Sequence, residues 1–200
     1  MEKQVIVTVG REAGSGGLEI ARKLAAKLGI TVYDQNIFEH IEEYYDIDTS
    51  NLQKYDETPR VKGFTRTVKG YTNSVEEQVV ELQRKFILEK AQEGESFVIL
   101  GRAGIKPLLD FPCLLIRCFI EADTDFKVAR VMAEHDYDEK QALRYMSWVD
   151  LKRKSYHNQF CHVKWGDRST YDIVLKSNKL GIDGTVDFLA DYVRRRVEQE

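Results

Sequence analysis

The sequence has little of what marks a secreted, membrane-bound or nucleic-acid-binding protein. Its three cysteines show no C-x-x-C spacing, so we expect reduced, intracellular thiols instead of a disulfide framework. No apolar run reaches the about 20 residues that span a membrane, and residues 1–4 lead into a strand without an apolar signal core. The net charge of −3 argues against a nucleic-acid partner. These absences predict a cytoplasmic protein with neither a membrane nor a nucleic acid as partner.

A glycine-rich loop near the start of the chain lacks the usual phosphate-binding lysine. The β-branched residues 5–9 predict a strand, and an amphipathic helical pattern follows the loop. The loop contains Gly10, Arg11, Gly14, Ser15, Gly16 and Gly17. Glycines let backbone N–H groups converge on a phosphate, and the helix N-terminus adds about half a positive charge. In the pattern G-x-x-x-x-G-K-[ST], lysine and a hydroxyl residue follow the second glycine, whereas Gly17 and Leu18 follow Gly16 here.

Short apolar strands alternate with helical patterns along the rest of the chain. The expected strands are residues 5–9, 30–33, 96–100, 113–120 and 171–175. Five strands alternating with helices predict an α/β protein, with a parallel sheet that is covered on both faces.

Several polar residues allow two interpretations. Asp34 follows the second strand, so it could be the N-cap of a helix over 35–45 or contact a substrate at the carboxyl end of the sheet. Asp138 and Gln141 resemble a capping box, and they open a helix whose expected inner face is Ala142, Leu143, Met146 and Val149. The histidines show no metal-binding spacing, and we expect His157 and His162 to be solvated.

Residues 46–74 are polar and basic. They contain Arg60, Lys62, Arg66 and Lys69 within ten residues. Long segments of this kind are often functional, and this one could be a solvated face or a wall that holds an anionic substrate.

Four features in order resemble the cytidylate kinase-like family, a branch of the P-loop nucleoside monophosphate kinases. They are the glycine loop, Leu100-Gly-Arg102, a helix carrying Asp150-Leu-Lys-Arg153, and Tyr171-Asp172 before Ser177. The resemblance covers nearly the whole chain. It implies a three-layer α/β/α fold of the P-loop NTPase type, with a five-stranded parallel sheet and a nucleotide at the glycine loop.

The resemblance also implies a division of the single domain, residues 1–200. Its core is 1–45, 75–149 and 170–200, with a substrate-binding insertion at about 46–74 and a lid at about 150–169. Nucleotides are the implied small-molecule partners, with ATP and Mg²⁺ as cofactors.

Arginines are the residues that we expect to carry the chemistry. Phosphoryl transfer needs phosphates held in line and their charge neutralised, and the guanidinium fork binds phosphate oxygens bidentately. Arg102 follows a strand and should point into the crevice, Arg153 resembles a lid arginine, and Arg130 resembles an arginine at the nucleotide. A salt bridge or an exposed face is the alternative for each. The resemblance places Asp34 and Asp172 at the monophosphate, although Asp172 could equally hydrogen-bond a lid residue.

Three departures from the family pattern concern the chemistry. The loop lysine is missing, and we predict that Arg11 replaces its charge. Residues 98–100 offer no carboxylate where a Walker-B aspartate is expected. Glu12 brings a negative charge to the loop, which is tolerable if Arg11 or Arg22 pairs with it or if it holds the metal.

Two functions therefore remain open. One is ATP-dependent phosphoryl transfer to a pyrimidine nucleoside monophosphate, CMP or dCMP, with Arg11, Arg102 and Arg153 as catalytic residues. The other is a nucleotide-binding or sensing domain that has lost catalysis with its lysine. A small P-loop kinase with another acceptor is a third possibility.

Overall fold

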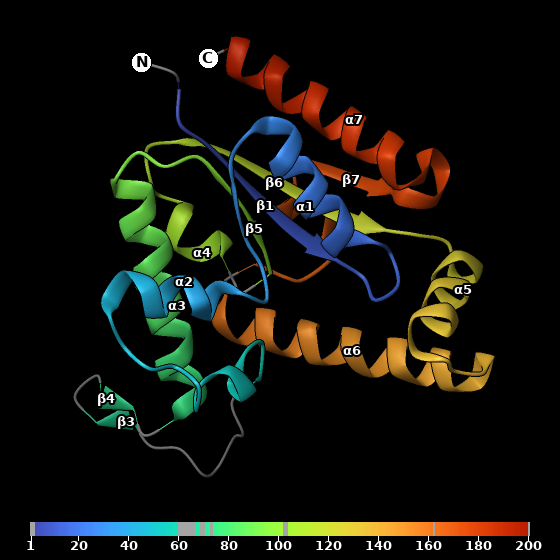
Figure 1. The fold of residues 1–200 in the computed structure, drawn as a ribbon, viewed down its shortest axis with the longest axis horizontal. Helices are drawn as coiled ribbons and strands as arrows, with labels where there is room; N and C mark the ends of the chain where they lie inside the picture. Colours follow the sequence, from blue (N-terminus) through green and yellow to red (C-terminus); the bar gives the residue numbers. More distant parts are fainter. Residues whose placement is uncertain are drawn as a thin grey trace.

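A parallel five-stranded sheet is the centre of the computed structural model, which describes residues 3–59, 67–68, 71–72, 74–101, 104–161 and 163–199. The strand order is β2-β5-β1-β6-β7, and every neighbouring pair is parallel (Figure 1). The strands are β1 (Val5–Arg11), β2 (Thr31–Tyr33), β5 (Phe97–Leu100), β6 (Leu114–Glu121) and β7 (Ile173–Lys176). A short antiparallel pair, β3 (Thr67–Val68) and β4 (Tyr71–Thr72), lies apart from this sheet. The expected α/β fold is confirmed.

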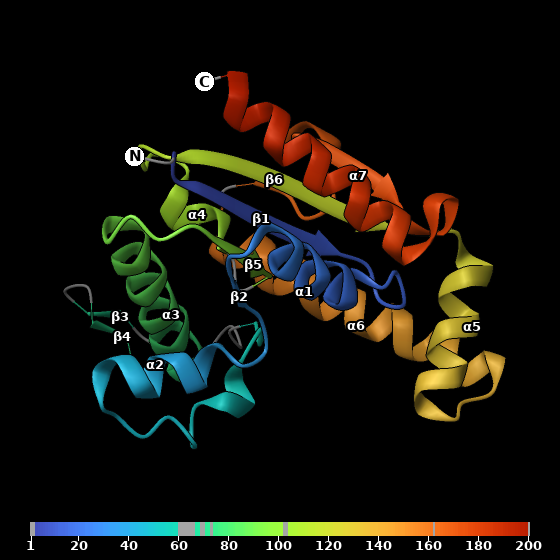
Figure 2. The same ribbon diagram turned by 45° about the horizontal axis from the view of Figure 1, so that its top comes forward.

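Helices cover both faces of the sheet. They are α1 (Gly17–Leu28), α2 (Ile37–Tyr45), α3 (Val75–Gln92), α4 (Ile105–Leu108), α5 (Thr124–His135), α6 (Glu139–Phe160) and α7 (Ser177–Gln199), with 3₁₀ turns η1 (Gln53–Tyr55) and η2 (Arg168–Thr170). Helices α1 and α7 lie side by side on one face, and α2, α3 and α4 lie on the other (Figure 2). Helix α5 and the first half of α6 extend beyond the carboxyl ends of the strands.

The central strand β1 is buried on both faces, as its apolar sequence predicts. Val5, Val7 and Val9 pack with α1 and α7, whereas Ile6 packs with α2 and α3. The chain then leaves β1 at the carboxyl edge of the sheet, directly into the glycine loop. This edge is where open α/β folds bind ligands.

Two expectations about local structure were wrong. Helix α2 begins at Ile37 after Asn36, so Asp34 is not its N-cap; the Asp34 carboxylate instead binds Arg22 Nε at 2.5 Å. Leu143 is 42% exposed, although Ala142 and Met146 are buried on the inner face of α6 as expected. The capping box of Asp138 and Gln141 is present.

Helix α6 runs without interruption through the expected start of the lid at residue 150. Its last turns are buried, because Tyr156 and Phe160 pack against Val80 of α3. His157 is also buried, so the expectation that it is solvated was wrong. The four cations Arg60, Lys62, Arg66 and Lys69 lie outside the described residues, as does His162. Among the helices of the described part, none has the length and apolar character that crossing a bilayer requires.

Candidate functional site

The glycine loop is held closely between two helices. Gly14 (φ 73°) and Gly16 (φ 77°) adopt the left-handed conformation that favours glycine. A Cβ atom on Gly14 would lie 2.7 Å from the backbone oxygen of Lys127 in α5, and one on Gly16 would collide with Ile182 of α7. Gly16 is also the N-cap residue of α1. Only glycine fits this loop, which brings the amino end of α1 to the sheet edge.

Ser15 stabilises the loop from within. It is fully buried, and its hydroxyl donates a hydrogen bond to the Glu12 carbonyl at 2.8 Å. The Ser15 carbonyl in turn accepts one from Ser177 Oγ at 2.6 Å, which ties the loop to α7. The predicted contact of Ser15 with a nucleotide stays a prediction.

Arg11 occupies the space that a side chain at position 17 would need. Arg11 ends β1 and is 8% exposed. A Cβ atom on Gly17 would collide with Arg11 Cβ and lie 2.9 Å from Arg11 Cγ. Position 17 is where the standard lysine would stand. The lysine is therefore absent for a steric reason, since the stem of an arginine fills its place.

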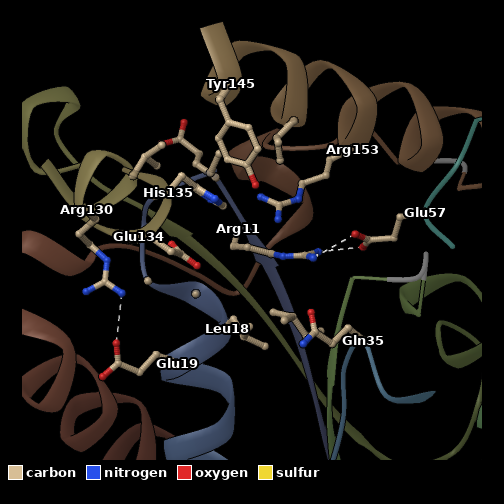
Figure 3. Close-up of a pocket in the computed structure, with 18 of the residues that line it drawn as sticks. Arg11, Leu18, Glu19, Gln35, Glu57, Arg130, Glu134, His135, Tyr145 and Arg153 are labelled. Carbon is tan, nitrogen blue, oxygen red and sulfur yellow. Dashed lines mark hydrogen bonds and ion pairs between the residues drawn. The ribbon is translucent and has the colours of Figure 1, made fainter. Parts of the chain in front are cut away.

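The Arg11 guanidinium forms a two-pronged ion pair with Glu57, which follows η1. Nη1 lies 2.8 Å from Oε1, and Nη2 lies 3.0 Å from Oε2 (Figure 3). Both side chains are largely buried, at 10% and 16% exposure. Gly101 makes room for the pair, since a Cβ atom there would collide with both side chains. An acidic residue of the 46–74 segment thus contacts the loop arginine.

Arg153 of α6 lies beside this pair (Figure 3). Burial and the positive charge of Arg11 lower the pKa of Arg153 to about 10. Its Nη1 atom is 3.7 Å from Asp150 Oδ1, and it has no hydrogen-bond partner among the described residues. Two guanidinium groups thus lie close together, with Glu57 bound to one of them and Asp150 3.7 Å from the other.

Two more contacts fix α5 and α6 to the loop. The Ala13 amide donates a hydrogen bond to Asp150 Oδ1 at 2.7 Å, and burial raises the pKa of Asp150. Glu12 binds Lys127 Nζ at 2.8 Å. The pairing of Glu12 with Arg11 or Arg22, one of the expected alternatives, is therefore replaced by a pair with Lys127, and its role at the metal stays a prediction. The loop acid is neutralised from α5 instead.

Two cavities meet at the Arg11–Glu57 pair. The larger one, about 1030 Å³, lies over the glycine loop between α1 and the α5–α6 unit. The smaller one, about 30 Å³, lies among β1, the residues after β5, and the carboxyl end of α6. Arg11, Glu57 and Arg153 line both cavities.

The smaller cavity is aromatic, with unsatisfied polar atoms. Trp165 packs edge-to-face on Phe119 with ring centroids 5.2 Å apart, and Tyr171 packs on the same ring. His157 Nε2 and Thr8 Oγ1 are buried and have no hydrogen-bond partner in the described part of the chain. Burial lowers the pKa of His157 to about 4, so the imidazole is neutral near pH 7.

Comparison with known proteins identifies the family of this chain. The model of the cytidylate kinase-like family matches residues 6–179. This chain belongs to the cytidylate kinase-like family. The expected resemblance is confirmed over most of the sequence.

Individual relatives agree with this membership. A cytidylate kinase from Methanopyrus kandleri is 24% identical over 204 residues, which cover 98% of this chain and 96% of the relative. The crystal structure of an uncharacterized protein from Eubacterium ventriosum matches with a TM-score of 0.74 and 35% identity, covering 96% of this chain and 99% of that one. A shikimate kinase from Bacteroides thetaiotaomicron, 15% identical with a TM-score of 0.55 over 95% and 98% of the two chains, shares the fold. The predicted P-loop-type α/β/α architecture is confirmed.

For this member of the cytidylate kinase-like family, the structure brings together only part of the predicted site. Arg11, Gly14, Gly16, Gly17, Arg130 and Arg153 line the larger cavity, and Gly10 lines the smaller one. Arg130 Nη2 binds Glu19 Oε2 at 3.1 Å there. Arg102 lies outside the described residues.

Two predicted substrate residues, Asp34 and Asp172, do not line either of the two cavities that meet at Arg11. Asp34 is buried against Arg22. Asp172 Oδ1 binds Arg117 Nη2 at 2.7 Å, and its Oδ2 accepts from the Arg117 amide at 2.8 Å. Their roles at the substrate stay predictions.

Three residues of the site were missed from the sequence. Glu57 gave no signal, because its partner lies 46 residues away. Lys127 gave no signal either, because its partner Glu12 lies 115 residues away. Asp150 stands one helical turn before Arg153, so its place on the same face could have been inferred.

Proposed function

We propose that this protein transfers the γ-phosphoryl group of ATP to a pyrimidine nucleoside monophosphate, CMP or dCMP. The observation that carries the proposal is the position of Arg11 and Arg153, which line both cavities. A phosphoryl group passing between two nucleotides has to cross such a junction. Paired guanidinium groups there would neutralise its developing charge.

The larger cavity is the proposed site of the ATP phosphates. Gly14, Gly16 and Gly17 line it at the amino end of α1, where backbone amides and the helix dipole favour anions. Arg130 lies on the same wall and would contact the nucleotide. Arg11 would supply the charge of the missing lysine from a neighbouring position.

The carboxylates beside the loop are compatible with Mg²⁺. Glu12 and Asp150 flank it, and each already binds one partner. No group of three metal-ligating side chains occurs among the described residues. Mg²⁺ commonly binds through one or two carboxylates together with nucleotide phosphates, so these two residues would hold it with ATP. The ion would add charge neutralisation at the transferred group.

The smaller cavity marks the proposed acceptor side, and at about 30 Å³ it has to widen before a nucleotide can enter. Its aromatic lining and the two buried polar atoms of Thr8 and His157 suit an uncharged ring with hydrogen-bonding groups. The 46–74 segment would form the outer wall, with Arg102 at the acceptor phosphate, and residues 150–169 would act as the lid. The cytidylate kinase from Methanopyrus kandleri supports CMP as the acceptor.

In the proposed reaction an oxygen of the acceptor phosphate attacks the γ-phosphorus of ATP. The bond from that phosphorus to the β–γ bridging oxygen breaks, and ADP leaves. The chain contributes alignment, charge and exclusion of water.

An assay of ADP release tests the proposal directly. Purified protein with ATP and Mg²⁺ is offered CMP, dCMP, UMP or AMP, and thermal stability is measured with each nucleotide alone. We expect turnover to be fastest with CMP or dCMP. Stabilisation by nucleotides without turnover would select the alternative, a catalytically impaired nucleotide-binding or sensing domain. Turnover with a different acceptor would overturn the pyrimidine assignment alone.

A further inference from the structure

The Glu57 carboxylate sits where a phosphoryl group would be bound. Its two oxygens face the two terminal nitrogens of Arg11 at 2.8 and 3.0 Å. Carboxylate and phosphate bind a guanidinium fork in the same bidentate way. Arg11 therefore cannot bind a phosphoryl group through its two terminal nitrogens while Glu57 occupies both of them.

Glu57 binds only one of the two guanidinium groups at this position, and Asp150 lies at the longer distance of 3.7 Å from the other. Burial and then the positive charge of Arg11 lower the pKa of Arg153, whereas the negative charges of Glu57 and Asp150 raise it. Arg153 Nη1 is buried and has no hydrogen-bond partner in the described ranges, and its nearest ion-pair contact, to Asp150, is 3.7 Å long. A dianionic phosphoryl group could contact both guanidinium groups, whereas Glu57 brings one negative charge.

Glu57 also has an unfavourable backbone. Its φ of 47° lies in the left-handed region, which costs energy for a residue with a side chain. The pair with Arg11 offsets that cost, and loss of the pair would let the backbone relax. The conformation in which Glu57 pairs with Arg11 is therefore less favourable in free energy than the short ion-pair distances alone would indicate.

We propose that Glu57 is an intramolecular competitor for the phosphoryl site at Arg11 and Arg153. A phosphoryl group enters only by displacing the Glu57 carboxylate, so this residue decides which anions the site accepts. Because Glu57 lines both cavities, its departure also enlarges the space between them. The inference rests on the proposed function only for the identity of the natural ligand, since any polyphosphate can report the competition.

Binding of inorganic pyrophosphate in metal-free buffer tests the proposal without turnover. The variants are Glu57→Gln and, as the matched control, Glu43→Gln, which removes the same charge from an exposed position of α2. Affinity is measured by calorimetry, and circular dichroism verifies folding. We expect Glu57→Gln to bind pyrophosphate roughly tenfold more tightly than wild type, since the site is no longer occupied by its own carboxylate. Glu43→Gln should match wild type.

A double variant shows whether the gain depends on Arg11. In an Arg11→Gln background, Glu57→Gln should tighten binding much less, because the guanidinium that Glu57 binds directly is gone and only Arg153 remains. Unchanged or weaker pyrophosphate binding by Glu57→Gln would overturn the proposal and make Glu57 a residue that positions Arg11. The same holds if pyrophosphate binds none of the proteins. Absence of ADP release with every acceptor would instead refute the proposed function and leave this result standing.

Discussion

Gly17 and Arg11 approach so closely that no side chain fits between them. A Cβ atom on Gly17 would collide with Arg11 Cβ and lie 2.9 Å from Arg11 Cγ. The two positions are therefore linked: a chain with arginine at the end of β1 requires glycine at the first position of α1. In the proposed phosphate site, this arrangement would place the cation on the strand instead of on the helix.

Substituting Gly17 should destabilise the fold instead of restoring a standard loop. We expect Gly17→Ala to lower the free energy of unfolding by about 1–3 kcal/mol through overpacking, and Gly17→Lys by more. Urea denaturation measures the loss. Gly29→Ala is the control, since a Cβ atom there meets nothing within 4 Å and only the left-handed φ of 68° is strained. Equal stability of Gly17→Ala and wild type would contradict the proposed clash.

Arg153 should matter more for turnover than for stability. Its charge is buried beside Arg11, and burial lowers its pKa to about 10. We expect Arg153→Gln to reduce kcat by about 10²–10³-fold, the usual effect of losing one transition-state donor. The melting temperature should stay equal or rise, because a buried repulsion is removed. Arg144→Gln, an exposed arginine of the same helix, should leave both unchanged. A large fall in stability with kcat preserved would refute the assignment.

His157 should make the fold sensitive to acid. Burial lowers its pKa from 6.5 to about 4, so between these values the unfolded chain binds a proton that the folded chain does not. Stability is therefore fully present above pH 6.5 and lost as the pH falls toward 4, by up to about 3 kcal/mol.

Denaturation curves between pH 7 and 4 measure this loss, with His157→Gln as the comparison. The variant should show a shallower decline over that window. Parallel curves for the two proteins would mean that His157 is accessible to protons in the folded state.

A substitution of Asp172 distinguishes a structural role of this residue, in its contact with Arg117, from a role in binding the substrate. Both Asp172 oxygens bind Arg117, so we expect Asp172→Asn to lower the free energy of unfolding by about 1–2 kcal/mol. The KM for CMP should change by less than about twofold. A tenfold rise in KM at unchanged stability would restore the predicted contact with the acceptor.

The fold could be predicted from the sequence because its signals are local. Five apolar strand segments and the capping box before α6 were all correctly predicted. The same holds for the glycine loop between β1 and α1, whose glycines lie close together in the sequence.

The residues of the site that could not be predicted make contacts with residues far away in the sequence. The sequence around Glu57 does not indicate a contact with Arg11. The sequence around Asp150 likewise does not indicate a contact with the amide of Ala13, 137 residues away. His157 was misjudged for the same reason, since its burial depends on packing of α6 against the sheet and α3. Asp34 shows the reverse case: its local sequence favours a helix cap, but its buried carboxylate pairs with the half-exposed Arg22 instead.

Helix α6 reaches every part of the candidate site within a few turns. Asp150 receives the amide of the glycine loop, Arg153 stands at the junction, and His157 lines the smaller cavity. A rigid rod cannot shift one of these groups without shifting the others. A ligand that tilts α6 from one cavity therefore changes the shape of the other cavity. Two ligands bound in the two cavities at the same time should affect each other's affinity.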